Sequence, residues 1–256
     1  MVTETSLSLF PLAGVPLIEG GADLAAVVTA ALETSGRSLV DGDIVVLAQK
    51  IVSKAEGRLV ELAGVTASAQ AIDIAQQVDK DPRLVELILS EAQEVMRVRK
   101  GVLIVRHRLG LVLANAGIDQ SNIDHDGQPR ALLLPVDPDA SARTLRAALA
   151  ERCGVDVAVL IIDSLGRAWR TGTTGTAIGV AGMPALLDLR GREDLHGRRL
   201  ETSELGLADE VAAAASLVMG QADEGRPIVI VRGVEHDRRD GSAADLIRPR
   251  HMDLFA

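Results

Sequence analysis

Hydrophobic positions recur with helical periodicity in five stretches of the chain. Apolar residues spaced three and four apart give each predicted helix one apolar face. Asp23 lies at the start of the first helix, where a carboxylate suits the helix dipole, and Gly220 follows the last, as glycine commonly does. Asp81-Pro82 separates two neighbours, because proline breaks one helix and can open the next. The predicted helices cover residues 23–33, 68–79, 83–96, 138–152 and 207–220.

Short aliphatic runs between these helices predict strands. The run at 155–162 is apolar without clean alternation, which is typical of a central strand buried on both faces. Residues 101–105 and 111–118 flank a five-residue connection and indicate a hairpin. Further strands are predicted at 44–48, at 227–231 and, more weakly, at 176–182. The mixture predicts an α/β (mixed α+β) fold, and without repeats or low-complexity linkers residues 1–256 form one unit, with room for two lobes.

Composition narrows the class of protein. Of the 256 residues, 47% are hydrophobic and 25% are charged, as in a globular chain. The only aromatic residues are Phe10, Trp169 and Phe255, and the net charge is -9, so neither a stacking platform nor a basic surface for nucleic acid is expected. Cys153 is the only cysteine, which excludes a disulfide framework. No signal peptide or membrane-spanning run is present, so we expect a cytoplasmic protein without membrane contact.

Two predicted strand ends carry aspartate. Asp163 and Ser164 follow the strand at 155–162, and Asp119 follows the strand near 111–116, with Asn122 three residues later. Ligands gather where strands end in open α/β sheets, and carboxylate oxygens are what Mg²⁺ or Mn²⁺ requires. The alternative is local: Asp163 caps the next turn and Asp119 forms an Asx-turn.

Three further features could bind anions. Arg167 and Arg170 lie on either side of Trp169, and their guanidinium groups suit phosphate or carboxylate. The alternative for this pair is a solvated surface. Lys50 and Lys54 come just after a strand and could reach phosphates or lie on a solvent-facing surface. The glycines at 172, 175 and 179 predict a Gly/Thr-rich loop whose N–H groups could cradle an anion, although neither common phosphate-loop motif occurs.

Six long blocks of sequence, in order along nearly the whole chain, resemble the coenzyme F420-0:gamma-glutamyl ligase family. They are GVPLIEGGADL, DGDIVVLAQKIVSKAEGR, RLGLVLANAGIDQSN, LLPVDPDASARTLRAAL, VLIIDSLGRAWRTG and ADEVAAAASLVMG, with PIVIVRGV after them. The resemblance implies two α/β lobes that pair as an intertwined homodimer. The actinobacterial branch of this family often continues into a nitroreductase-like flavin domain. Such a domain would begin about where this chain reaches HMDLFA.

The resemblance also implies an activity. Members of this family use GTP to join the carboxylate of coenzyme F420-0 to L-glutamate and then add further glutamates through γ-linkages. GTP is thought to phosphorylate the carboxylate, and the amine then displaces phosphate from the acyl phosphate. This chemistry needs cations, here Mg²⁺ or Mn²⁺ with K⁺ as an additional ion, to offset crowded negative charge. No enzyme nucleophile is required.

Carried over by position, Asp119 and Asp163 match the metal ligands of the family, and Ser164 adds a hydroxyl where Thr is more usual. The nucleotide contacts carried over are Val15, Pro16, Leu17, Ile18, Gln49, Lys54, Asn122, Gly220 and Gln221. Gln49 stands where relatives often have Ser or Thr. Arg167 and Arg170 are expected to face an anionic substrate and complete the catalytic set. Two alternatives remain: a metal-dependent phosphohydrolase, and a non-catalytic lobe that needs a missing partner domain.

Overall fold

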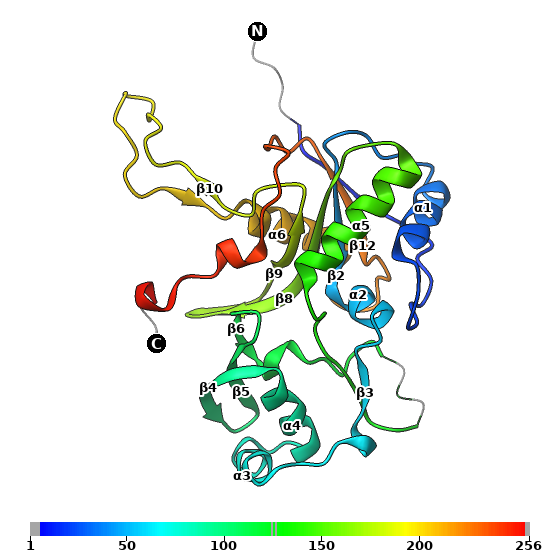
Figure 1. The fold of residues 1–256 in the computed structure, drawn as a ribbon, viewed down its shortest axis with the longest axis vertical. Coiled ribbons are helices and arrows are strands. Elements are labelled where there is room, and N and C mark those ends of the chain that lie inside the picture. Colours follow the sequence, from blue (N-terminus) through cyan, green and yellow to red (C-terminus); the bar gives the residue numbers. More distant parts are fainter. Residues whose placement is uncertain (1–5, 124, 126, 254–256) are drawn as a thin grey trace.

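A five-stranded mixed sheet forms the centre of the molecule (Figure 1). The structure is a computed structural model that describes residues 6–123, 125 and 127–253. Across the sheet the strands are β1 (Ser8–Pro11), β12 (Ile228–Arg232), β2 (Ile44–Ala48), β8 (Ala158–Arg167) and β9 (Arg170–Ala181). Strands β2 and β8 are parallel, and the other neighbours are antiparallel. The predicted mixed α/β class is confirmed.

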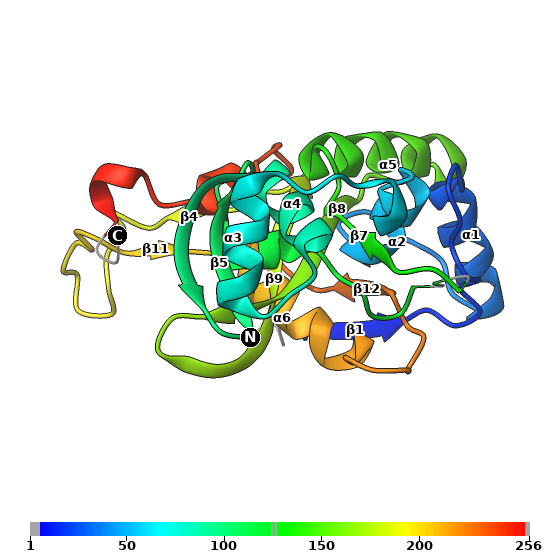
Figure 2. The same cartoon turned by 90° about the horizontal axis from the view of Figure 1, so that it is seen from below.

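Helices cover both faces of this sheet. On β2, Val45 and Leu47 pack into the cluster with three helices, whereas Ile44 and Val46 pack into the cluster with the fourth. The three are α1 (Leu24–Thr34), α2 (Gln49–Ala55) and α5 (Pro138–Cys153), and the fourth is α6 (Leu207–Met219). Figure 2 shows α1 and α5 on one side of the sheet and α6 on the other. Burial on both faces explains why the central strands read as continuous apolar runs.

Local signals set the ends of these helices. The Asp23 carboxylate accepts a hydrogen bond from Ala26 N (3.0 Å) at the start of α1. Asp137 does the same for Ala140 N (2.9 Å) at the start of α5. Gly220 follows α6 with a φ of 78°, which favours glycine. The predicted helices at 23–33, 138–152 and 207–220 are thus confirmed.

Residues 59–132 form an inserted segment with its own hydrophobic cluster, below the main sheet in Figure 1. It leaves the main sheet after α2 and returns before α5. Its strands are β3 (Leu59–Glu61), β4 (Ala92–Arg99), β5 (Val102–His107), β6 (Val112–Ala114) and β7 (Arg130–Leu132). Its helices are η1 (Leu62–Gly64), α3 (Ala69–Val78), α4 (Pro82–Ser90) and η2 (Asn115–Gly117). The predicted hairpin is β5–β6, extended by β4 into a three-stranded sheet.

One predicted helix is wrong in its second half. The helix expected at 83–96 ends at Ser90, and residues 92–99 form strand β4 against β5. In β4, half-buried and exposed positions alternate in part, which is a strand pattern that the helical assignment overlooked. Pairing with β5 outweighs the helical propensity of Glu94 and Met96.

Strands β8 and β9 also correct the sequence-based expectations. Strand β8 does not end before Asp163 but continues to Arg167 and turns into β9. The predicted Gly/Thr loop is part of β9. A Cβ at Gly175 would lie 2.3 Å from Ala212 O of α6, and one at Gly179 would lie 2.5 Å from Pro138 O of α5. These two glycines therefore allow both helices to pack closely on β9.

Two further segments complete the described chain, the first of which projects from the body. Strands β10 (Leu187–Asp188) and β11 (Glu204–Leu205) carry the projecting hairpin, residues 187–205, shown in yellow in Figure 1. After β12 the chain forms η3 (Ala243–Leu246) and η4 (Arg250–Met252). The chain end at 254–256, near the expected start of a flavin domain, lies outside the described residues. None of the described helices has both the length and the apolar character that crossing a membrane requires.

Candidate functional site

Asp119 and Asp163 approach each other from the inserted segment and the main sheet. Asp163 lies on β8, and Asp119 follows η2, where it pairs with Leu132 through two backbone hydrogen bonds of 3.0 and 2.8 Å. The two carboxylates are close enough for the charge of Asp119 to raise the pKa of Asp163. Convergence of two acidic side chains was expected from their strand ends.

Two lysines of α2 join the main sheet to the loop that carries Asp119. Lys50 Nζ lies 2.5 Å from Asp119 Oδ2 and donates a hydrogen bond to Ser121 Oγ (2.9 Å). Lys54 Nζ donates to the backbone oxygen of Asn122 (2.8 Å). Because Lys50 and Lys54 are four residues apart on one helix, their side chains reach the same side. The ammonium groups therefore lie beside the candidate carboxylates.

The two carboxyl groups have opposite pKa shifts. Burial raises the pKa of Asp163 and Asp119 raises it further, which outweighs the lowering effects of Ser164 N–H, Lys50 and Gln49. Burial also raises the pKa of Asp119, but hydrogen bonds from Lys50 and Ser121 lower it below its usual value overall. Burial, with Lys50 nearby, lowers the pKa of Lys54. A buried carboxyl beside another carboxylate lacks enough positive charge, so an added cation would be stabilised here.

The turn after α6 closes one side of this group. Ser164 Oγ donates to Gln221 Oε1 (2.7 Å), and Asn122 Nδ2 donates to the backbone oxygen of Ala222 (3.2 Å). Gly220 has a φ of 78° and a ψ of 177°, a conformation that side-chain-bearing residues rarely adopt, so the turn needs glycine there. The structure thus brings Gln221 to Ser164, with Gly220 one residue before it.

The predicted nucleotide-contacting segment at 15–18 is a loop between β1 and α1. Pro16 and Leu17 are exposed, and Ile18 is buried. The loop continues to Gly21, whose N–H donates to Ala55 O at the end of α2 (2.8 Å). Gln49, at the start of α2, is buried and accepts a hydrogen bond from Ser53 Oγ (2.9 Å). Helix α2 therefore connects the 15–18 loop to the lysines.

Arg167 and Arg170 are not brought to this group. They face each other across the β8–β9 turn, with Trp169 between them at a φ of 62°, and all three are exposed. Within the described residues, neither guanidinium contacts Asp119 or Asp163. The reason is that β8 continues past Asp163, so each arginine lies several residues farther along the hairpin.

The ligand set for a metal is small. Among residues 6–123, 125 and 127–253, no group of three or more His, Cys, Asp or Glu side chains could hold a metal ion. Asp119, Asp163 and the Ser164 hydroxyl offer oxygen only, the donor type that Mg²⁺ shares with water and substrate phosphate. Sequence reasoning left the pairing of Lys50 and Ser121 with Asp119 unrecognised. Lys50, two residues after the end of β2, was the available signal.

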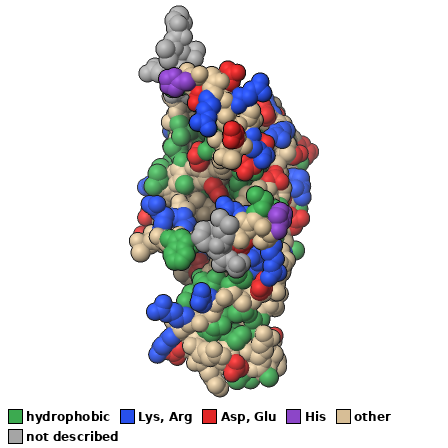
Figure 3. Space-filling view, turned by 90° about the vertical axis from the view of Figure 1, so that its left-hand side faces the viewer, with side chains coloured by type: hydrophobic (Ala, Val, Ile, Leu, Met, Phe, Trp, Pro, Cys, Tyr) green, Lys and Arg blue, Asp and Glu red, His purple; other side chains and the backbone are tan. Residues whose placement is uncertain are grey.

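Other surfaces of the molecule are less distinctive. A cavity of about 520 Å³ lies at the opposite end of β2 and includes Asp43, Arg232 and His236. The Arg232 guanidinium there is bound to the buried Asp43 carboxylate at 2.7 Å. Figure 3 shows a face on which basic and acidic side chains are interspersed. That face lacks the continuous positive charge that a phosphate backbone binds.

Comparisons with known proteins point to one family. Residues 14–233 match the family model described as F420-0:Gamma-glutamyl ligase. The chain is 49% identical over 251 residues to coenzyme F420:L-glutamate ligase of Methanothermobacter thermautotrophicus, covering 97% of this chain and 98% of that protein. It is 45% identical over 242 residues to the Methanopyrus kandleri protein of the same name, with 93% of each covered. The Methanocaldococcus jannaschii protein so named is 44% identical over 215 residues, with 84% of this chain and 85% of that protein covered.

Proposed function

The chain belongs to the F420-0:gamma-glutamyl ligase family, and on that premise we propose that it joins L-glutamate to the carboxylate of coenzyme F420-0. Relatives that it matches over nearly their full length are named coenzyme F420:L-glutamate ligase. The observation that carries the proposal is the meeting of Asp119 and Asp163 from separate parts of the chain, with Lys50 and Lys54 beside them. Such a site suits phosphoryl transfer from GTP to a carboxylate, in which several negative charges come close together.

The proposed reaction has two steps. A carboxylate oxygen of coenzyme F420-0 attacks the γ-phosphorus of GTP, the bond to the β-phosphate oxygen breaks, and GDP leaves. The amine of glutamate, after losing a proton, then attacks the acyl carbon and expels inorganic phosphate, which leaves an amide. Later rounds repeat these steps on the γ-carboxylate of the added glutamate. The ammonium groups of Lys50 and Lys54 would offset the charge of the phosphates during transfer.

The side chains suited to a divalent cation are Asp119, Asp163 and Ser164. The raised pKa of Asp163, caused by burial and the neighbouring carboxylate, supports a cation there, because the protein supplies too little positive charge. When bound, Mg²⁺ or Mn²⁺ would neutralise phosphate oxygens and orient them. A requirement for K⁺ stays a prediction.

The nucleotide is proposed to lie along α2 and the loops beside it. Backbone atoms of residues 15–18 and the Lys54 ammonium come from the main sheet, and Asn122 comes from the inserted segment. The turn at Gly220 and Gln221 contacts Ser164 and the Asn122 loop. Gln49 is buried, so its role there would be to orient neighbours such as Ser53.

Arg167 and Arg170 are proposed to bind an anionic group of the acceptor or of glutamate, away from the reacting carboxylate. Their exposed positions on the β8–β9 turn support contact with a long ligand or a second protomer. The family's two-lobed form and intertwined homodimer are part of the proposal. A link to a flavin domain stays a prediction.

Mass spectrometry tests this proposal directly. The purified chain is incubated with coenzyme F420-0, L-glutamate, GTP and Mn²⁺, and with mixtures lacking one component each. Mass increments of glutamate that vanish without GTP are expected. GTP hydrolysis that needs neither acceptor nor glutamate would favour the phosphohydrolase, and a folded, GTP-binding chain without products would favour the non-catalytic lobe.

A further inference from the structure

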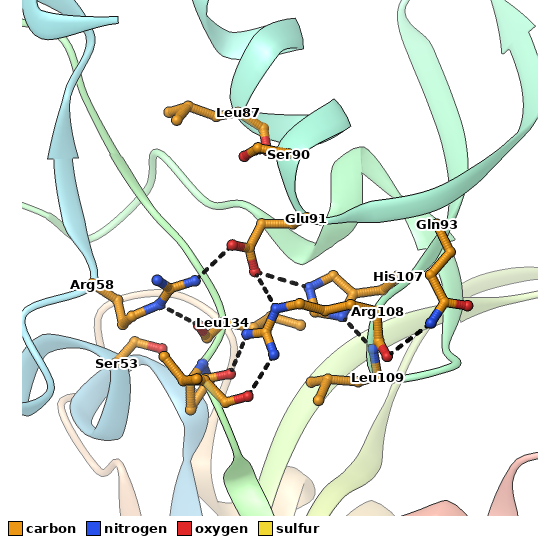
Figure 4. A network of polar contacts seen from close by, with 12 residues as sticks. Ser53, Arg58, Leu87, Ser90, Glu91, Gln93, His107, Arg108, Leu109 and Leu134 are labelled. Atoms are coloured by element: carbon orange, nitrogen blue, oxygen red, sulfur yellow. Dashed lines mark hydrogen bonds and ion pairs between the residues drawn. The ribbon is translucent and has the colours of Figure 1, made fainter.

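Behind the candidate site lies a buried carboxylate that the proposed reaction does not use. Glu91 follows α4 in the inserted segment and is only 8% exposed. Its Oε1 accepts a hydrogen bond from Arg58 Nη2 (2.8 Å), and its Oε2 accepts one from Arg108 Nε (2.9 Å). Figure 4 shows both guanidinium groups converging on this one carboxylate.

The chain crosses between the main sheet and the inserted segment twice, at residues 56–58 and at residues 133–137. The two arginines bind the chain at these crossings. Arg58 lies in the first crossing, just after α2, and its Nε donates to Leu134 O in the second crossing (2.9 Å). Arg108 donates from Nη2 to Pro135 O (3.0 Å) and from Nη1 to Val136 O (2.5 Å). The Glu91 carboxylate is therefore linked, through the two arginines, to both crossings.

His107 completes the cluster and is fully buried. Its Nδ1 accepts a hydrogen bond from Leu109 N (3.0 Å), so in the neutral ring the proton is on Nε2. That Nε2 lies 3.4 Å from Glu91 Oε2, too far for a well-formed hydrogen bond. The histidine thus packs against the Glu91 carboxylate and presents an N–H to it.

A few hydrogen bonds connect this cluster to Asp119. The backbone of Asp119 is paired with Leu132, and Leu134 O, two residues later, is held by Arg58. In the other direction, Arg58 lies four residues after Lys54, which binds the Asn122 carbonyl beside Asp119. The placement of Asp119 relative to Asp163 therefore depends on both crossings.

We propose that Glu91 is a positioning residue that holds Asp119 beside Asp163 by tying together both crossings. The proposal rests on the proposed function for its consequence in catalysis, but the positioning itself can be tested separately. Buried charged networks of this kind hold a defined geometry, and removing one partner disturbs the groups that it binds. Loss of the Glu91 charge should loosen the Asp119–Leu132 pairing without loosening β8.

The test compares Glu91→Gln with Glu94→Gln in the full chain. Glu94 also lies in the inserted segment and also pairs with two arginines, Arg106 (3.8 Å) and Arg250 (3.1 Å), but it touches neither crossing. Hydrogen exchange of the Asp119 and Leu132 amides is expected to accelerate about tenfold or more in Glu91→Gln alone. Amides of β8 and α5 should keep their wild-type rates. Unchanged exchange at Asp119 and Leu132, or a uniform rise everywhere, would overturn the proposal.

A second readout follows Mn²⁺ binding without turnover, by the electron paramagnetic resonance signal of free Mn²⁺. Glu91→Gln is expected to bind Mn²⁺ about tenfold more weakly and to lower kcat, with little change in KM for glutamate. If the wild-type chain binds no Mn²⁺, the metal assignment fails, while the exchange experiment still decides the role of Glu91. Should Glu91→Gln not fold, Arg108→Gln removes the two carbonyl contacts and the Arg108–Glu91 pair, and keeps the Arg58–Glu91 pair. It should show the same local pattern, and an unchanged pattern counts against the proposal.

Discussion

The two carboxylates of the candidate site differ in how well their negative charge is compensated. Asp119 has Lys50 as a direct partner, whereas Asp163 is largely buried and has a raised pKa. An ionised, buried carboxylate is costly unless a cation compensates it. Asp163 is therefore expected to matter more for function than for folding.

Replacing Asp163 with asparagine separates these two roles. Asp163→Asn keeps the side-chain shape and removes a poorly compensated charge, so the free energy of unfolding should change by less than about 1 kcal/mol or rise. Ligation should fall by about 100-fold or more, because a proposed cation ligand is lost. Rates come from product mass spectrometry and stability from urea unfolding. The control is Asp188→Asn, at the exposed β10. If Asp163→Asn ligates at a near wild-type rate, Asp163 is not part of the site.

Glu91 makes stability depend on pH in a defined direction. Burial opposes its ionisation, but contacts with His107, Arg58 and Arg108 lower its pKa from 4.5 to about 2. A carboxyl group whose pKa is lower in the folded than in the unfolded state stabilises the protein at pH values above its unfolded-state pKa. This contribution is lost as pH falls from about 4.5 toward 2. The stability difference between wild type and Glu91→Gln should shrink by about 2 kcal/mol from pH 6 to pH 3. Urea unfolding at several pH values measures it, and a constant difference would show that the Glu91 pKa is not lowered.

At the scale of elements, local signals predicted helix ends better than strand ends. Asp23 and Gly220 mark helix ends through capping, which depends on neighbours in sequence. The first half of strand β4 was taken for helix and part of β9 for a loop. Each strand pairs with its direct neighbour in sequence, β5 or β8, but local propensity and composition did not indicate that pairing. The meeting of Asp119 with Asp163 was expected from strand ends, although β8 in fact continues past Asp163 to Arg167. The Glu91 cluster could not be predicted, since its arginines are 33 and 17 residues away.

Strand β9 offers a test of packing between a strand and a helix. Gly175→Ala would place a methyl group 2.3 Å from Ala212 O and 2.8 Å from Ser216 Cβ, so α6 must shift. The expected loss in the free energy of unfolding is about 1–3 kcal/mol, typical of overpacking. Gly166→Ala on the same hairpin meets open space and should cost far less. Equal losses in both variants, measured by urea unfolding, would show that α6 does not constrain Gly175.

At the scale of the whole molecule, the inserted segment and the C-terminal part of the chain are joined at several points. Ser242 Oγ donates to Asp139 Oδ2 (2.6 Å) at the start of α5, and Arg250 lies 3.1 Å from Glu94 on β4. The C-terminal residues thus connect α5 to the inserted segment. The projecting hairpin, in contrast, extends from the body and carries Leu195, which is fully exposed.

The expected homodimer can be tested at the projecting hairpin. Leu195 on this hairpin is fully exposed, and we expect the second protomer to cover it. Light scattering after size exclusion should give a particle of twice the 26.9 kDa chain mass. Leu195→Lys should shift this particle toward the monomer, whereas Ile72→Lys, on the half-exposed face of α3, should not. A wild-type mass of 26.9 kDa would contradict the dimer, and a Leu195→Lys dimer of unchanged affinity would exclude the hairpin from its interface.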